Sequence, residues 1–310
     1  SKVETMENMF YDCNKLKEID LSKFTTPVLK TMKSMFYSCD GLSSLKFPQN
    51  LDTSKVTDMS YLFSYCYQLT SIDLSKFNTS SVVSMEYMFC HCEKINSFDF
   101  SNFDTSKVEN MGHMFDSCTK ITSLDLSNFN TFLVTNMEYM FSNCKQIKNF
   151  NFQIINEEEK TLRIKFKCGL SHWPFTKGYD KCIEELTTTT IYNFDTSNVK
   201  NMRYMFSSCS SLESFDFSHF NTSLVENMNY MFSGCSSLAS INFENIITSK
   251  VNSMEGLFQG CINIQNIDFS LFKTDSLKSV SRIFENSNCK EFVNLKNFDI
   301  SRVEDISYMF

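Results

Sequence analysis

The chain has 310 residues, of which 42% are hydrophobic and 21% charged, a composition that predicts a folded chain rather than a disordered one. Its formal net charge of −7 and its lack of a Lys/Arg run argue against binding to the phosphate backbone of nucleic acids. No apolar stretch reaches the roughly 18 residues that a membrane-spanning helix needs, so we expect no membrane span in this sequence.

The chain repeats one unit from its first residues onward. The unit can be read from Met111 to Asn136, MGHMFDSCTKITSLDLSNFNTFLVTN, and it restarts at Met137. Its anchoring Phe recurs at steps of 26, 27, 26, 26 and 26, then 65, then 26 four times. A fixed period of this size is typical of a solenoid, in which one unit stacks on the next. The anchors are Phe10, Phe36, Phe63, Phe89, Phe115, Phe141, Phe206, Phe232, Phe258, Phe284 and Phe310.

One part of each repeat has the period of a β-strand. In the segment beginning at Ile121, the apolar residues Leu124 and Leu126 lie two positions apart, which is the periodicity of a strand. We expect each such strand to pair with the same strand of the next repeat, so that one long parallel sheet covers one face of the solenoid.

The other part of each repeat has a different period. Val108, Met111, Met114 and Phe115 follow one another at steps of three, three and one, which predicts a short helix on the opposite face. Ser106 precedes this segment with Glu109 three residues later, the pattern of a helix-capping box. The expected fold is therefore an α/β solenoid of units of 26 residues.

The methionines and most cysteines occupy fixed positions in the repeat. All 17 Met fall in two columns, represented by Met111 and Met114, on the helical face that also carries the anchoring Phe. We interpret them as core residues, the alternative being a Met-rich binding surface. Nine Cys follow their anchors by three residues, and we expect them to be buried, unpaired thiols: Cys13, Cys39, Cys66, Cys92, Cys118, Cys144, Cys209, Cys235 and Cys261.

The repeat pattern MxxMFxxCxxLxxLDLSxFxTSxV resembles the BspA-like class of leucine-rich repeats, a family of surface proteins in bacteria and protists. The resemblance covers residues 1–155 and 181–310, and its Met-Phe, Cys, LDLS and TS-x-V elements recur in phase. It implies a right-handed leucine-rich-repeat solenoid and a role in adhesion or protein binding. The departures are small, with Ser287 where Cys is expected and one extra residue in the second repeat.

An aspartate recurs between the last two apolar residues of the strand. Adjacent strands would place these carboxylates in a row on the exposed sheet face, each with a Ser two residues later. The row is a candidate binding surface, and the alternative is a polar face that solvent and Ser hydrogen bonds stabilise; a flat row seldom supplies the oxygen ligands that calcium needs. Its members include Asp73, Asp99, Asp125 and Asp216.

Residues 156–180 depart from the repeat and form an insertion between its two halves. Trp173 and Tyr179 beside Arg163 or Lys177 would suit an interaction hot spot, since insertions in repeat proteins commonly lie on the binding face. The alternative is a loop that folds over its own solenoid. Outside the regular column, Cys168 and Cys182 bracket this loop and are candidates for a disulfide.

We expect one continuous array with both ends uncapped, because SKVETMENMF at the start aligns with SRVEDISYMF at the end. The sequence contains no catalytic constellation and no phosphate-binding glycine loop. Cys90-His91-Cys92 has a metal-like spacing, but Cys92 belongs to the buried column, so no metal or cofactor is expected.

The sequence thus favours a non-enzymatic protein-binding or adhesion module at a cell or particle surface. Its partner would be another protein or neighbouring copies of itself. The alternative is an intracellular scaffold in a large assembly. Sugar on either sequon, Asn78-Thr79-Ser80 or Asn221-Thr222-Ser223, would favour a secretory route.

Overall fold

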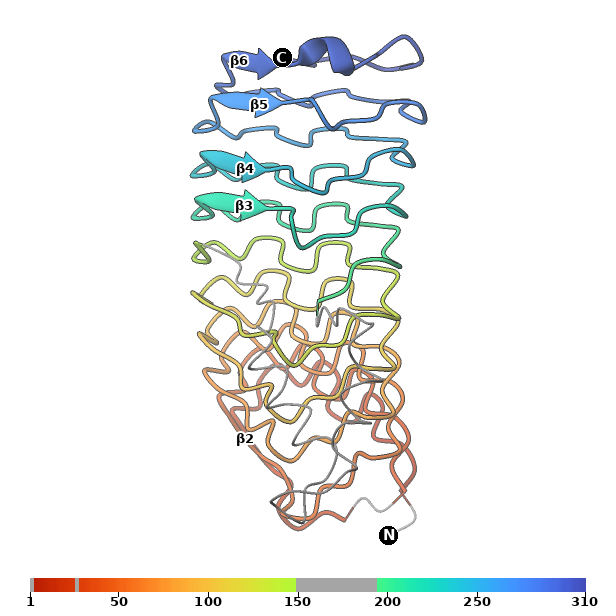
Figure 1. Ribbon diagram of the computed structural model, residues 1–310. Coiled ribbons are helices and arrows are strands. Elements are labelled where there is room, and N and C mark those ends of the chain that lie inside the picture. Colours follow the sequence, from red (N-terminus) through yellow and green to blue (C-terminus); the bar gives the residue numbers. More distant parts are fainter. Residues whose placement is uncertain (1–2, 26–27, 149–193) are drawn as a thin grey trace, which may run out of the picture.

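The computed structural model describes residues 3–25, 28–148 and 194–310 of the chain. Each repeat forms one coil, and the coils stack along one axis from the N-terminal to the C-terminal end (Figure 1). The predicted repeat solenoid is therefore present. Its elements are β1 (Glu18–Asp20), β2 (Ser44–Lys46), β3 (Ser214–Asp216), β4 (Ser240–Asn242), β5 (Asn266–Asp268), β6 (Glu291–Val293) and the 3₁₀ helix η1 (Leu295–Asn297).

The predicted strand segment pairs in parallel, but within the described residues it does so in only three places. β1 pairs with β2, β3 with β4 and β5 with β6, each with equivalent residues opposite one another, as in the pair Ile19 and Leu45. The described coils between residues 51 and 148 contain no strand. The expected single long sheet is thus replaced by three short two-stranded sheets. We call this side of the solenoid the strand face.

The predicted helices are absent from the described chain, apart from the single short turn of η1. In the coil of Phe115 the N–H groups of Met111, His113 and Phe115 donate to carbonyl oxygens of the next coil at 3.1, 2.8 and 3.0 Å. The N–H of Met114 closes a tight turn onto the oxygen of Met111 at 3.2 Å. Alternate N–H groups thus bond between coils, so the ladder of bonds within one segment that an α-helix requires cannot form.

This second side of the solenoid, built from stacked tight turns, we call the turn face. It comprises residues 110–117 and their equivalents in the other coils. Its first residue bridges to the same residue of the next coil, in an unbroken series from Thr5 to Asp305. The capping box of Ser106 with Glu109 has no helix to cap, and the Glu109 N–H donates to Val83 O at 2.8 Å in the preceding coil.

The core between the two faces is a set of stacked columns. The eleven anchoring Phe rings form ten successive parallel stacks, with centroids 5.5–6.1 Å apart. The Met columns are buried as predicted, except at the ends of the array, where Met9 is 42% exposed and Met309 is partly exposed. Burial of these apolar side chains is the main favourable contribution to the stability of the fold.

Cysteine and threonine columns satisfy the carbonyl groups between coils. The Cys144 thiol donates to Phe115 O at 3.2 Å, and seven other column cysteines make the equivalent bond to the anchoring Phe of the preceding coil. The column cysteines are free thiols, as predicted, and all are buried except Cys13, which is partly exposed in the first coil. Buried Thr79 donates to Asp104 O at 2.9 Å and accepts the Asp104 N–H at 2.8 Å.

The array continues across the segment between residues 148 and 194. Phe141 N donates to Met205 O at 2.9 Å, and the Cys209 thiol donates to Phe141 O at 3.1 Å. The coil of Phe141 therefore lies directly on the coil of Phe206, although their anchors are 65 residues apart in the sequence. The predicted domain boundaries at 155/156 and 180/181 lie outside the described residues and stay predictions.

Candidate functional site

The aspartates singled out from the sequence lie in exposed positions on the strand face. Each uses Oδ1 to accept the backbone N–H of the serine two residues later, at 3.0 Å for Asp73, 3.0 Å for Asp99, 2.8 Å for Asp125 and 2.8 Å for Asp216. The Ser75 hydroxyl also donates to Asp73 at 2.6 Å. Each of these four carboxylates therefore closes a local turn in its own coil.

These hydrogen bonds explain how the row of like charges is accommodated. The Ser75 hydroxyl and N–H groups lower the pKa of Asp73, and the Ser101 N–H and hydroxyl groups lower that of Asp99. The fold thus favours the ionised carboxylates over the protonated ones. Among the described residues no group of three or more His, Cys, Asp or Glu side chains is arranged to hold a metal ion.

The candidate residues of the insertion, Trp173, Tyr179, Arg163 and Lys177, lie outside the described residues. The same is true of the candidate disulfide pair, Cys168 and Cys182. Their assigned roles stay predictions.

The turn face carries a feature that the sequence reading did not single out. Two residues before the anchor, six consecutive coils carry an aromatic ring, and these rings stack face to face. The centroid distances along this aromatic ladder are 4.5, 4.0, 4.4, 4.4 and 4.8 Å, with planes 8–14° apart. Its members, all partly exposed, are Tyr61, Tyr87, His113, Tyr139, Tyr204 and Tyr230.

The aromatic ladder depends on an unusual backbone conformation. Every ring belongs to a residue in the left-handed region, from φ 54° at Tyr139 to φ 59° at Tyr61. This conformation aims the side chain sideways out of the stacked turns, so that it lies over the equivalent ring of the next coil. Left-handed backbone at a bulky residue costs energy and is concentrated at functional positions in many proteins.

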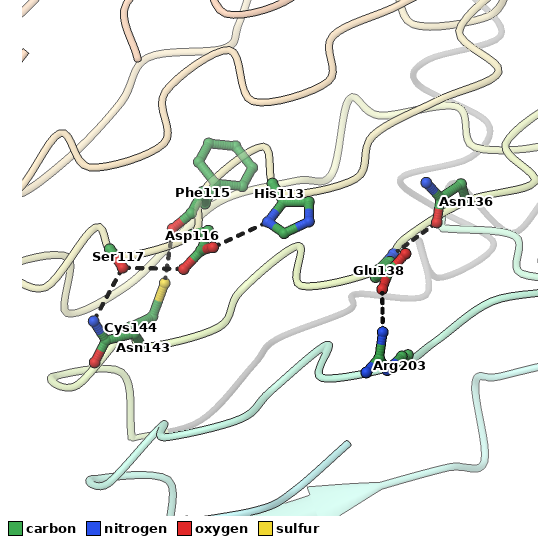
Figure 2. Close-up of polar contacts among 9 residues, drawn as sticks. All are labelled: His113, Phe115, Asp116, Ser117, Asn136, Glu138, Asn143, Cys144 and Arg203. Carbon is green, nitrogen blue, oxygen red and sulfur yellow. Dashed lines mark hydrogen bonds and ion pairs between the residues drawn. The ribbon is translucent and has the colours of Figure 1, made fainter. Parts of the chain in front are cut away.

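Charged and polar groups lie near His113 of the aromatic ladder and in the adjacent coils (Figure 2). Next to it, the His113 Nδ1 lies 3.0 Å from the Asp116 carboxylate, which also accepts the Ser117 hydroxyl at 3.0 Å. In the coils that follow, Arg203 Nη1 lies 3.5 Å from Glu138 Oε1. The turn face thus combines aromatic surface with ordered, mainly acidic groups.

The described tyrosines gather on one side of the solenoid. Every tyrosine in the described part of the chain lies within four residues of an anchoring Phe, on or next to the turn face. Partial burial raises the pKa of several of their hydroxyl groups, among them Tyr37, Tyr61 and Tyr139. The sequence contained a signal for this column, because Tyr recurs in phase two residues before the anchor in six repeats.

The buried cysteines of the column are poor nucleophiles. Burial raises the pKa of Cys39, Cys209 and Cys261 to about 12, so these thiols stay protonated near neutral pH. In the Cys90-His91-Cys92 segment both thiols are buried with raised pKa, while His91 Nδ1 lies on the surface 3.2 Å from Glu93. The metal-like spacing therefore does not bring its three side chains together.

Comparison with known proteins places the repeat in a family. The model of the family described as "Mycoplasma protein of unknown function, DUF285" matches residues 1–46, 43–154, 181–246 and 237–310, which leaves out only residues 155–180. The chain belongs to this family. No curated protein matches the chain. In the described residues no helix is long and apolar enough to cross a membrane.

Solved structures with similarity to the chain are leucine-rich repeat proteins. One from Eubacterium ventriosum is 17% identical with a TM-score of 0.39, and the match covers 87% of this chain and 65% of that one. A leucine rich cell surface protein from Faecalibacterium prausnitzii is 16% identical with a TM-score of 0.33, covering 94% and 86%. A leucine-rich repeat protein of T. pallidum is 13% identical with a TM-score of 0.24, covering 83% and 69%. The family match, which covers both parts of the array, agrees with the resemblance to BspA-like repeats.

Proposed function

We propose that the chain is a non-enzymatic protein-binding module displayed at a cell surface, and that the turn face is its contact surface. The observation that carries the proposal is the aromatic ladder of six stacked rings. Tyrosine is enriched in protein interfaces and at their energetic hot spots, because it supplies a large rigid area with a polar edge.

Rigidity supports this assignment. Inter-coil hydrogen bonds hold the turn face along the whole described array, whereas strands pair in only three places on the strand face. Stacking fixes the ladder rings further, since each ring has a neighbour within 4.8 Å. A surface that is ordered before binding loses little conformational entropy on contact, and this favours affinity.

The surface location draws on the comparisons. The structure from Faecalibacterium prausnitzii is described as a leucine rich cell surface protein. The insertion over residues 156–180 would add a second contact region, with Trp173 and Tyr179 as its anchors.

The contact surface can be tested with the purified chain coated on beads. We expect the beads to adhere to one or more immobilised cell-surface or extracellular-matrix proteins. In a variant with Tyr87→Asn and Tyr139→Asn, adhesion should fall at least about tenfold, the size of a hot-spot loss. Asn is chosen because it tolerates left-handed backbone. A matched variant of the strand face, Thr122→Ala with Ser123→Ala, should adhere like the unchanged chain.

Two results would contradict the proposal. Either no immobilised protein retains the beads, or the tyrosine variant adheres as strongly as the unchanged chain while both melt at the same temperature. Location is tested separately, with an antibody against the chain applied to intact cells. Staining that requires permeabilised cells would contradict display at the surface.

A second candidate function is the intracellular scaffold within a large assembly. It is favoured by one observation, that all cysteines in the described part of the chain are free thiols, because reduced thiols are the usual state inside cells. The same antibody experiment separates the two candidates.

A further inference from the structure

The N-terminal end of the turn face carries a denser group of rings than the rest. The Tyr37 ring stacks on Tyr11 at 4.8 Å and meets Tyr61 and Tyr65 edge-on at 6.0 and 5.4 Å. Tyr65 in turn stacks on His91 at 4.6 Å. Together with Tyr67, which meets Tyr65 at 5.9 Å, these six residues form what we call the tyrosine cluster, and Tyr11 is 50% exposed.

Carboxylates border the tyrosine cluster. Asp12 follows Tyr11 directly, and Glu93, whose side chain is 43% exposed, lies 3.2 Å from His91. Asp40 and Glu86 lie near enough to act electrostatically on the Tyr67 and Tyr61 hydroxyl groups. The two lysines at the border are engaged, Lys33 with Asp58 at 3.8 Å and Lys94 with Gln68 at 2.6 Å.

Two places farther along the same face show what such a combination binds. The Arg203 guanidinium lies 4.8 Å from the centroid of the Tyr204 ring, beside Glu138 at 3.5 Å. The Arg282 guanidinium lies 4.5 Å from the Tyr308 ring, beside Glu285 at 2.9 Å. In both places a ring and a carboxylate hold one guanidinium, an arrangement that combines a cation–π contact with an ion pair.

We propose that the tyrosine cluster binds the guanidinium or ammonium groups of an Arg/Lys-rich segment in a partner protein. The cluster supplies the rings and carboxylates that hold Arg203 and Arg282 elsewhere on this face, and the partner supplies the cation. The inference rests on the proposed protein-binding function and specifies its partner. Net negative charge on the chain, −7 overall, accelerates association with a basic segment.

The size of the cluster sets the length of the bound segment. It extends over four coils, from Tyr11 to His91, and coils spaced like paired strands at about 4.8 Å make it about 14 Å long. An extended peptide rises about 3.3 Å per residue, so about five residues span this length. Basic residues at alternate positions would all face the cluster.

The test uses a fluorescent peptide, Gly-Arg-Gly-Arg-Gly-Arg-Gly with blocked ends, titrated with the chain in fluorescence anisotropy. We expect saturable binding that weakens as salt is raised. The same peptide with citrulline in place of arginine keeps the shape but loses the charge, and it should not bind. A lysine version should bind more weakly, because an ammonium group makes fewer directed contacts than a guanidinium.

Three double variants locate the site. Tyr11→Ala with Tyr65→Asn removes two rings, and Asp40→Asn with Glu93→Gln removes two charges at constant shape. Each should raise the Kd about tenfold. Asp99→Asn with Asp125→Asn removes the same charge from the strand face, and it should change the Kd less than about twofold. All three should still unfold in one cooperative transition well above the temperature of the binding assay, which shows that each variant is folded when its Kd is measured.

Equal weakening in the two charge variants, with no change in the ring variant, would show attraction by overall charge alone and would overturn the inference. So would equal binding of the citrulline peptide. If the arginine peptide does not bind while the Tyr87→Asn/Tyr139→Asn variant still loses protein adhesion, the basic-segment inference fails and the protein-binding function stands. If the unchanged chain neither binds the arginine peptide nor adheres to any immobilised protein, both proposals are rejected.

Discussion

At the scale of single residues, the turn face depends on left-handed backbone. In the described part of the chain, twenty non-glycine residues have positive φ, and 18 of them fall two residues before or two residues after an anchoring Phe. Each such residue costs about 1–2 kcal/mol relative to ordinary backbone. Inter-coil hydrogen bonds offset this cost, and in the aromatic ladder ring stacking adds about 0.5–1.5 kcal/mol per pair.

Gly256 occupies the ladder position after Tyr230, and the Tyr230 ring lies over it. A Cβ at Gly256 would overlap the ring, in addition to the strain of its φ of 57°. We expect Gly256→Ala to lower the free energy of unfolding by about 1–3 kcal/mol, measured by urea denaturation. The matched control is Gly260→Ala, with φ 69° but only ordinary contacts near 3.6 Å. Equal losses in the two variants would show that the ring contributes nothing.

Thr105 tests the buried threonine column. Its hydroxyl donates to Asn130 O at 2.9 Å and accepts the Asn130 N–H at 2.8 Å. Thr105→Val keeps the shape but leaves both groups unpaired, so we expect a loss of about 1–3 kcal/mol in the free energy of unfolding. Exposed Thr122→Val is the control and should change stability by less than about 0.5 kcal/mol. A neutral Thr105→Val variant would mean that the two backbone groups find other partners.

At the scale of elements, the repeat pattern predicted which residues are buried better than it predicted the backbone. Steps of three, three and one at Val108, Met111, Met114 and Phe115 fit a helix, but they fit stacked tight turns equally well. What separates the two is whether N–H groups bond within the segment or to the next coil, and no single repeat carries that information. Local propensity was misleading as well, because bulky residues such as Tyr87 rarely adopt left-handed backbone.

The candidate site shows the same division. The alternation of apolar and polar residues predicted that the side chains of the aspartate row are exposed. It could not predict the hydrogen bonds by which they close turns, because these depend on the geometry of the loop that follows. The aromatic ladder could have been found from the in-phase recurrence of Tyr61 and Tyr87. Its stacking could not, since this requires the left-handed residues that place the rings over one another.

Phe115 tests the core columns. Its ring is fully buried between Phe89 and Phe141, at 5.9 and 5.8 Å. Phe115→Asp would bury an unpaired charge, and we expect the loss to exceed about 4 kcal/mol and to unfold the neighbouring coils. Phe132→Asp, at a side chain that is 55% exposed, should melt like the unchanged chain. Hydrogen exchange, followed coil by coil, would show whether the loss stays local.

The cysteine column predicts a strong contrast in thiol reactivity. Burial holds the pKa of Cys39, Cys209 and Cys261 near 12, far above the usual value of about 8.5, and it also blocks access. At pH 8 iodoacetamide should leave the eight buried column thiols, from Cys39 to Cys261, unmodified in the folded chain and label all nine column thiols in denaturant without reductant. Mass spectra showing Cys13 joined to Cys39 would contradict the free-thiol column.

At the scale of the whole molecule, small contributions recur in coil after coil. Among the described residues, hydrogen bonds from the serine two residues later are the main cause of a lowered pKa at six carboxyl groups: Asp20, Asp52, Asp73, Asp99, Asp299 and Asp305. A carboxyl with a lowered pKa in the folded state stabilises the fold above its unfolded pKa of about 3.9, and this stability is lost as pH falls through the folded pKa. The array should therefore lose stability cooperatively below about pH 4.

Asparagine substitution isolates this effect, because an amide oxygen can still accept the serine N–H. A variant with Asn at Asp20, Asp52, Asp73 and Asp99 should show a smaller fall in Tm between pH 7 and pH 2.5 than the unchanged chain. Glu244→Gln, at an exposed carboxyl outside these serine turns, should leave the pH profile as it was. If the variant with four Asp→Asn changes loses as much Tm between pH 7 and pH 2.5 as the unchanged chain does, other groups are responsible for acid unfolding.

The contact between the coils of Phe141 and Phe206 has a consequence for engineering. Coils need not be consecutive in the sequence to be neighbours in the stack, since 65 residues separate these two anchors while Phe141 N still bonds to Met205 O at 2.9 Å. The array thus keeps its register at this junction although many more residues separate these two anchors than separate the others. Foreign cargo such as an epitope or a small reporter domain, grafted between residues 148 and 194, would be carried at mid-array by an unbroken column of coils.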